Sequence, residues 1–181
     1  MKSQSLLLIL ILLFFGLSIK SLFLKEPAVW PDEAITADIA KNIVEKGQPS
    51  TELWQGLLKG VEKRASFYPP IFFYILAFWF KVNGLSIANQ RLLTFVFSLG
   101  FLLIFYRFCQ LILKSRSKIS LLPLFLLTID FTFVKASRIS HPEIFVLFWG
   151  ILALYFFTKS AKTKKRNFFF LSLVFLLVLP F

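Results

Sequence analysis

Trp30-Pro31-Asp32-Glu33 is the stretch around which the chain is organised, because it follows the first apolar segment and opens a polar helix. Proline is favoured in the first turn of a helix, and acidic side chains there suit the positive end of the helix dipole. No other place in the sequence puts adjacent carboxylates so close to an apolar block of this length. The stretch therefore predicts a helix start that holds acid chemistry beside a membrane.

The residues behind this stretch predict an amphipathic helix over 31–46. Ile35, Ile39 and Ile43 recur every four residues, and Gly47 ends the pattern. This helix is too polar to cross a membrane, so we expect it to lie on the membrane surface with the isoleucine stripe facing the lipid. A second amphipathic helix is predicted over 52–64.

The composition indicates an integral membrane protein. The chain has 181 residues, of which 57% are hydrophobic and 17% charged, whereas soluble domains have about 25% charged residues. The net charge of +12 lies in short runs between apolar blocks, as in membrane proteins, so nucleic acid is not expected as a partner. One cysteine and one histidine cannot build a zinc site by themselves. The sequence does not identify a metal ligand set, so a divalent cation held by carboxylates or by the substrate stays open as a cofactor.

The apolar stretches predict an all-α, multi-span helical bundle with a long outer loop over 25–87. A short apolar helix over 70–82 would be about 20 Å long, too short to cross the bilayer. The first stretch is expected to be an uncleaved span rather than a signal peptide. The chain ends in an apolar run, so we expect a single membrane domain over 1–181 that is the N-terminal part of a longer protein. The predicted spans are 5–24, 88–113, 119–134, 144–158 and 168–181.

The basic turns at 114–118 and 159–166 are expected to be cytoplasmic, which sets the orientation of the bundle. The link 135–143 and the loop after the first span then lie outside. A rival count lets 70–82 cross, and it would place two basic turns outside or bring Asp32 inside. The preferred count brings one set of polar residues to a single membrane face: Asp32, Glu33, Arg91, Arg138, His141 and Glu143.

Within this set we expect Asp32 to be the catalytic group. A carboxylate there can take a proton from an attacking hydroxyl, as general-base chemistry requires. Adjacent helix positions diverge by about 100°, so only one of the two acids can face a substrate well. Glu33 is then expected to hold a cation or to orient the acceptor.

The remaining candidates each have two interpretations. Arg91 and Arg138 either extend to the interface by snorkelling or clamp a phosphate group. Lys135 is a weaker candidate of the same kind. Glu143 either pairs with Arg138 or belongs to the site, and His141 is either an interfacial polar residue or part of the binding set. Tyr68 either starts a helix with the prolines that follow it or contributes to substrate binding.

The ordered motifs resemble those of membrane glycosyltransferases of the C-type fold (GT-C), in the group that includes dolichyl-phosphate-mannose protein mannosyltransferases and the aminoarabinose transferase acting on lipid A. In that pattern an Asp-Glu pair heads a surface helix, and a Pro-Pro step, here Pro69-Pro70, opens an apolar stretch ending in Gly84. An arginine follows, here Arg91, and a later arginine and acid lie in a short outer link. The family's second acid is often Asp, whereas this chain has Glu143.

The resemblance implies transfer of a sugar from a polyprenyl-phosphate carrier to a hydroxyl of a protein, lipid or glycan, with inversion at the sugar carbon. It implies Asp32 as the base and the basic residues as ligands of the carrier phosphate. The expected partners are the lipid-linked donor, membrane lipids and the hydroxyl acceptor, and the expected location is the outer face of a bacterial or archaeal cell membrane. A transporter or flippase component for a lipid-linked anion, and a non-catalytic membrane subunit, stay open as alternatives.

Overall fold

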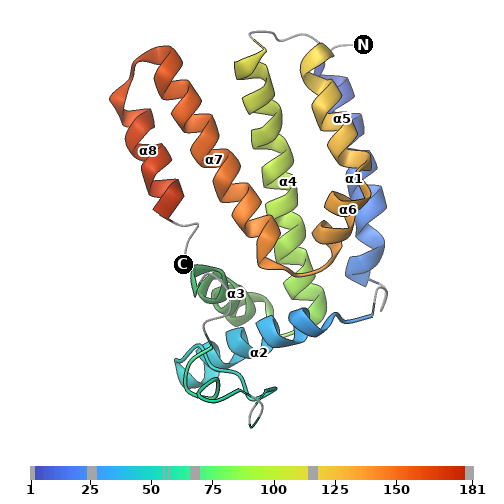
Figure 1. Ribbon diagram of the computed structural model, residues 1–181. Helices are drawn as coiled ribbons and strands as arrows, with labels where there is room; N and C mark the ends of the chain where they lie inside the picture. Colours follow the sequence, from blue (N-terminus) through green and yellow to red (C-terminus); the bar gives the residue numbers. More distant parts are fainter. Residues whose placement is uncertain are drawn as a thin grey trace.

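The computed structural model describes residues 3–23, 28–54, 56, 58–65, 70–113 and 118–177, and within these ranges every regular element is a helix. The predicted all-α membrane fold is therefore confirmed. In Figure 1 most helices stand side by side as a bundle, while α2 and α3 lie across one end of it. The crossing pair is α2 (Pro31–Lys46) and α3 (Pro70–Asn83); the bundle contains α1 (Ser3–Phe23), α4 (Ile87–Ile112), α5 (Leu122–Ile129), α6 (Phe131–Arg138), α7 (Pro142–Thr163) and α8 (Arg166–Leu177), with a short 3-10 helix, Lys118–Leu121, leading into α5.

Among the described residues, α4 and α7 are each long and apolar enough to cross a membrane. The two helices stand close together, because a Cβ added at Gly100 of α4 would come within 2.7 Å of the Phe148 ring on α7. Only a residue without a side chain fits this crossing, as is usual where membrane helices approach closely.

The stretch expected to span over 119–134 is not one continuous helix, because the structure breaks it into α5 and α6. The two segments, Ile119–Ile129 and Phe131–Arg138, are bent by 61° relative to each other. Asp130 causes the break: its backbone is extended, and its Oδ1 accepts a hydrogen bond from the Phe133 N–H at 2.7 Å. An aspartate that caps a new helix start ends the preceding helix at the same place.

The expectation that the isoleucine stripe of α2 faces lipid is wrong. Ile35 and Ile39 are buried in an apolar cluster with Phe72, Phe73 and Leu76 of α3. The apolar α3 is therefore the surface that the stripe covers, and α2 and α3 pack as a pair at the end of the bundle. A separate cluster fills the bundle itself, formed by Phe14, Phe95, Leu102, Leu124 and Phe133 among others.

The second surface helix predicted over 52–64 is wrong as well, because the described residues of this segment form successive turns. Gly56 and Gly60 have φ angles of +86° and +89°, a region that helices do not use and that glycine tolerates best. The turns are tied back to the chain before them, since the Thr51 N–H donates to the Val61 carbonyl at 3.0 Å. Trp54, Val61 and Ala65 still face the α2–α3 core or are buried near it.

The two ends of the bundle differ in the residues that they carry. The end of α4, the start of α5 and the turn between α7 and α8 lie at one end of the bundle, together with the start of α1 (Figure 1). The start of α2 and the link between α6 and α7 lie at the other end, where α2 crosses. The start of α2 and the α6–α7 link, which carry most of the polar candidates, therefore lie at the end opposite the basic α7–α8 turn.

Candidate active site

The start of α2 is fixed by contacts of Trp30 and Glu33. The Trp30 carbonyl accepts hydrogen bonds from the N–H groups of Glu33 and Ala34 at 3.0 and 3.3 Å. In return, Glu33 Oε2 accepts the Trp30 N–H at 3.0 Å, as the acid of a capping box does. Pro31 occupies the first helical position, where its missing N–H is not needed. The predicted helix start is thus present, with both acids in its first turn.

Glu33 is fully buried and joins three parts of the fold. Its Oε1 accepts hydrogen bonds from Arg91 Nε and from the Ser140 N–H, both at 2.9 Å. Its Oε2 accepts Arg91 Nη2 at 2.8 Å in addition to the Trp30 N–H. The side chain therefore connects the start of α2 to α4 and to the link between α6 and α7.

The charge of Glu33 is stabilised where it lies. Burial alone would raise its pKa, but hydrogen bonds from Arg91, Ser140 and Trp30 together outweigh burial and lower the pKa below 4.5. The side chain of Arg91 is only 3% exposed in this pair. Both carboxylate oxygens of Glu33 accept hydrogen bonds from the Arg91 guanidinium, and both side chains are buried. Neither group is therefore exposed to a substrate.

A second set of buried polar groups supports this pair. Gln90 Nε2 donates to the Glu33 carbonyl at 3.1 Å and to Thr36 Oγ1 at 2.7 Å. On the next turn of α4, Thr94 Oγ1 lies 3.2 Å from Ser140 Oγ. Sequence reasoning missed these residues as part of the site, although a Gln-Arg pair at the start of an apolar span is a signal that could have identified them.

Asp32 points away from its neighbour. Its side chain is 35% exposed, whereas that of Glu33 is 0% exposed. Asp32 Oδ2 lies 3.9 Å from His141 Nε2, so the two groups face each other without a direct hydrogen bond. The structure therefore divides the Asp-Glu pair into a buried acid that holds the fold and an exposed acid that can meet a ligand.

His141 precedes Pro142 at the start of α7 and contacts a second acid. Its Nδ1 lies 3.1 Å from Glu143 Oε2, and its side chain is 17% exposed. The pKa of His141 is raised above 6.5, chiefly by the hydrogen bond to Glu143, which outweighs the opposing effect of burial. The predicted interpretation of Glu143 as the ion-pair partner of Arg138 is wrong, because Glu143 pairs with His141 instead.

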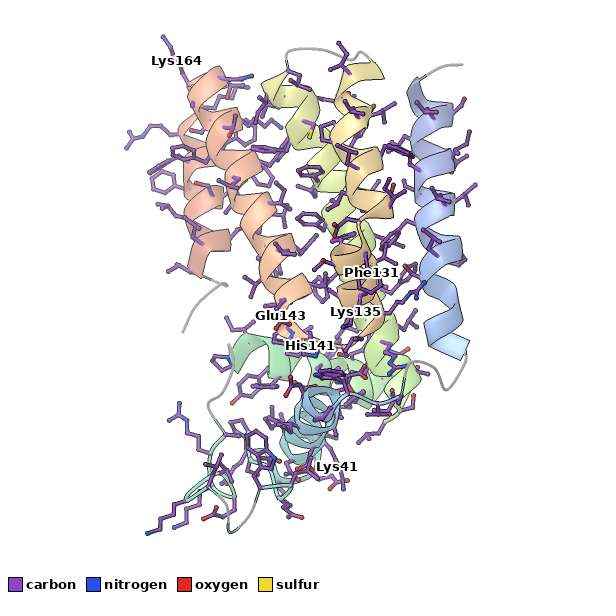
Figure 2. The ribbon with its side chains drawn as sticks, turned by 45° about the vertical axis from the view of Figure 1, so that its right-hand side comes forward. Lys41, Phe131, Lys135, His141, Glu143 and Lys164 are labelled. Atoms are coloured by element: carbon purple, nitrogen blue, oxygen red, sulfur yellow. The ribbon has the colours of Figure 1, made fainter. Side chains whose placement is uncertain are left out.

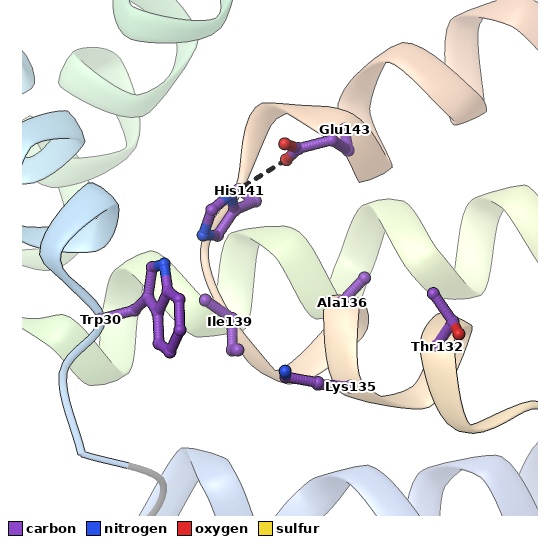
Figure 3. A pocket seen from close by; sticks show the side chains of 7 residues that line it. All are labelled: Trp30, Thr132, Lys135, Ala136, Ile139, His141 and Glu143. Carbon is purple, nitrogen blue, oxygen red and sulfur yellow. Dashed lines mark ion pairs between the residues drawn. The ribbon is translucent and has the colours of Figure 1, made fainter.

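A pocket of about 250 Å³ opens beside these residues. Figure 3 shows Lys135 and Trp30 on either side of Ile139, with the His141–Glu143 pair at the far edge. Lys135 Nζ lies 5.6 Å from the centroid of the Trp30 ring, within cation–π range. Thr132 and Ala136 complete the lining. Figure 2 labels three of the lining residues, Lys135, His141 and Glu143, near the end of the bundle that the crossing helices cover.

Among the described residues, the predicted site residues Asp32, Glu33, Arg91 and Arg138 are not in this lining. Arg138 is half-buried and donates from Nη2 to the Leu17 carbonyl of α1, while its Nε is buried without a partner among the described residues. Tyr68 lies outside the described residues. Lys135, the weaker candidate for a phosphate ligand, is the one of these three basic residues that lines the pocket.

Within the described part of the chain, no group of three His, Cys, Asp or Glu side chains is placed to hold a metal ion. Asp32 and Glu143 approach opposite nitrogens of the His141 ring rather than a common point. The chemistry that these side chains offer directly is proton transfer and charge stabilisation.

The fold and the site define an all-α membrane protein in which a glutamate, a histidine and a lysine line a pocket, and in which Asp32 faces that histidine from outside the lining. The chain belongs to the dolichyl-phosphate-mannose-protein mannosyltransferase family, whose profile matches residues 68–179, more than half of its length. The matched region supports a GT-C mannosyltransferase-like membership. It includes Arg91, Lys135, His141 and Glu143, whereas Asp32 lies before it.

A relative in Aquifex aeolicus (strain VF5), described as an uncharacterized protein, is 27% identical over 167 residues. The match covers 92% of this chain and 31% of the relative, so the chain spans about a third of the length of the curated relative it matches. An alignment of that length within 181 residues includes the whole region from Trp30 to Glu143 wherever it begins. No solved structure matches the chain significantly.

Proposed function

We propose that this chain contains the base and part of the donor site of a glycosyltransferase that moves a sugar from a polyprenyl-phosphate carrier to a hydroxyl group. The observation that carries the proposal is the division between the two adjacent acids. Glu33 is fully buried and ion-paired, whereas Asp32 is 35% exposed and faces His141, which lines the same pocket as Lys135. Membership of a mannosyltransferase family supports the class of reaction.

The pocket suits the phosphate end of a lipid carrier. Lys135 supplies a cation there, and an ammonium group is a common ligand of phosphate oxygens. Phe131, one turn before Lys135 on α6, is 77% exposed, and Ile129 at the end of α5 is 49% exposed. In this proposal the phosphate lies against Lys135, and the polyprenyl chain follows the apolar surface of α5 and α6 into the bilayer.

Asp32 acts on the acceptor in this proposal. The carboxylate takes the proton of the acceptor hydroxyl while the oxygen attacks the anomeric carbon of the sugar. A new carbon–oxygen bond forms on one face of the sugar, and the bond to the phosphate oxygen breaks on the other, so the configuration inverts. The electron pair of the broken bond stays on the carrier phosphate, whose charge Lys135 stabilises. Glu33 and Arg91 position the start of α2 and do not touch the substrate.

The site faces outward in this proposal. The basic residues of the α7–α8 turn lie at the other end of the bundle (Figure 2, where Lys164 is labelled), and basic turns favour the cytoplasmic side. The crossing pair of α2 and α3 then rests at the outer membrane surface, where a lipid-linked donor and an extracellular hydroxyl acceptor can meet.

The class of reaction can be tested with the purified chain in lipid vesicles that contain a radiolabelled mannosyl polyprenyl phosphate. We expect loss of the label from the carrier and appearance of a product whose anomeric configuration is opposite to that of the donor. Water or added alcohols can serve as hydroxyl acceptors, which makes the test independent of the natural acceptor. A product with retained configuration would contradict the proposal.

A further inference from the structure

His141 is the sole histidine of the sequence, and it lies between two carboxylates. Glu143 Oε2 is 3.1 Å from Nδ1 of the ring, and Asp32 Oδ2 is 3.9 Å from Nε2. A neutral imidazole donates from one nitrogen and accepts at the other. With Nδ1–H donating to Glu143, the nitrogen that faces Asp32 is the acceptor.

The three side chains differ in their access to solvent in a consistent order. The side chain of His141 is 17% exposed, that of Asp32 35% and that of Glu143 58%. The His141 ring is therefore the shielded member of the three, and the Glu143 carboxylate is the most accessible one. A proton that reaches the ring from Asp32 has a route to solvent on the side of Glu143.

The fold holds the ring in this place through its backbone. The Ser140 N–H donates to Glu33 Oε1 at 2.9 Å, and the His141 N–H donates to the Ile139 carbonyl at 3.0 Å. Pro142 then starts α7. The buried acid next to Asp32 therefore also fixes the link that carries His141, so the two sides of the 3.9 Å gap are held by one group.

We propose that His141 and Glu143 are positioning residues that carry away the proton which Asp32 takes from the acceptor hydroxyl. This inference rests on the glycosyltransferase function proposed above. The proton passes from the Asp32 carboxyl to Nε2, either after a small rotation of the exposed Asp32 side chain or through one water molecule. The imidazolium is held by Glu143 and returns one proton to solvent before the next turnover. Only O–H and N–H bonds change, so no further reactant is required.

The charges around the ring set the pH at which this route works. Glu143 raises the pKa of His141 above 6.5 against the effect of burial, and the charges of Asp32 and Glu33 act in the same direction. The neutral ring, which is the form that accepts a proton, therefore predominates only above that raised pKa. Turnover should rise with pH as the ring loses its proton.

Two cations complete the surroundings. Lys135 of α6 lines the same pocket as His141 and opposes protonation of the ring, while Arg91 of α4 is held in the pair with Glu33. Removing one carboxylate should therefore lower the pKa of His141 without removing the pocket.

The geometry can be tested by nuclear magnetic resonance, because labelled histidine reports on His141 alone. We expect the neutral ring to carry its proton on Nδ1, and the ring pKa to fall in Glu143→Gln and in Asp32→Asn. Glu45→Gln is the matched control, since Glu45 lies on α2 but is exposed and pairs with Lys41; it should leave the titration unchanged. A ring that carries its proton on Nε2, or a titration that neither site variant moves, would overturn the relay.

The role in turnover can be tested with His141→Gln, assayed with mannosyl polyprenyl phosphate across pH. We expect a fall of about tenfold above the His141 pKa, smaller than the 100-fold or more lost with a direct base, and loss of the rise with pH through that pKa. Imidazole added to His141→Gly should restore turnover in its neutral form, which a purely structural role would not explain. An unchanged rate and pH profile in a folded His141→Gln, with Asp32→Asn inactive, would overturn the relay and leave the glycosyltransferase proposal standing. Full activity of Asp32→Asn would instead overturn the proposed base.

Discussion

Asp32 and Glu33 are adjacent in the sequence, yet the structure gives them different surroundings. Glu33 accepts four hydrogen bonds from Trp30, Arg91 and Ser140, while Asp32 meets solvent and the His141 ring. Helix geometry produces the difference, since neighbouring side chains leave the axis about 100° apart. One acid can therefore stabilise the protein at the position where the other is available for chemistry.

The Glu33–Arg91 pair should dominate the stability of this end of the molecule. Glu33→Gln leaves a buried guanidinium without its counter-charge, and breaking a buried pair from one side costs about 3–5 kcal/mol. We expect this loss in the free energy of unfolding, measured by denaturant titration in detergent micelles. Glu45→Gln, which breaks an exposed pair with Lys41, should change that free energy by less than about 1 kcal/mol.

Removing both charges separates the electrostatic effect from packing. The double variant Glu33→Gln with Arg91→Gln should be more stable than Glu33→Gln alone, because no unpaired charge stays buried. Equal stability of the single and double variants would show that the guanidinium charge does not cause the loss.

The Glu33–Arg91 pair also predicts how the stability of the protein depends on pH. The pKa of Glu33 is lowered in the folded protein from 4.5, so its contribution is complete above about pH 4.5 and is lost as the pH falls through the folded value. Unfolding temperature in micelles should therefore drop as the pH is lowered from about 4.5 toward the folded pKa. In Glu33→Gln the drop should be smaller, and an identical acid dependence in both proteins would contradict the assignment.

For individual residues, the sequence predicted the helix start at Pro31 and indicated Asp32, Glu33 and His141 as site candidates. It could not predict which residues these side chains would pair with. The partner of Glu33 is 58 residues away in the sequence, and no local pattern records such a distance. Arg91 was expected to extend to the interface or bind phosphate, and it instead neutralises a buried acid. Lys135 was a minor candidate because exposure to a pocket depends on the bend before α6.

Asp130 determines the shape of the element that carries Lys135. By capping α6 it ends α5, and the bend of 61° turns Lys135 toward the pocket. The bend within the predicted span over 119–134 could not be predicted, because an apolar run indicates hydrophobicity and not the direction of the chain. The helix over 52–64 failed for a related reason: its apolar residues have helical spacing, but the positive φ angles at Gly56 and Gly60 give turns.

The cap can be tested by comparing Asp130→Ala with Asp130→Asn. Alanine removes the oxygen that accepts the Phe133 N–H and should cost about 0.5–2 kcal/mol, whereas asparagine keeps a capping oxygen and should cost little. Unfolding in micelles measures both. Equal losses in the two variants would indicate that charge, and not the cap, holds the break.

In the whole molecule, the candidate site and the basic α7–α8 turn lie at opposite ends of the bundle. α2, α3 and the α6–α7 link occupy one end, and the α7–α8 turn occupies the other (Figure 1). The sequence predicted this separation through the distribution of lysine and arginine, because orientation signals are local in the chain. The packing of α2 on α3 could not be predicted, since both the membrane and α3 offer an apolar surface to the same stripe.

The two ends should lie on opposite sides of the membrane. In a Cys109→Ser background, Lys41→Cys should react with an impermeant maleimide added outside intact cells, and Lys165→Cys should react only after the membrane is opened. Lys41 lies on α2 and Lys165 in the α7–α8 turn, and both are solvent-accessible. External labelling of both positions would contradict the orientation.

The central claim is that the exposed carboxylate of Asp32 is the base of sugar transfer, and its most direct test is the turnover of mannosyl polyprenyl phosphate by Asp32→Asn in vesicles. The amide keeps the size of the side chain but cannot take the proton, so turnover should fall by about 100-fold or more. Glu45→Gln, which also replaces a carboxylate by an amide on α2 but at an exposed position away from His141, should keep the wild-type rate. Turnover of Asp32→Asn at the rate of Glu45→Gln would contradict the claim.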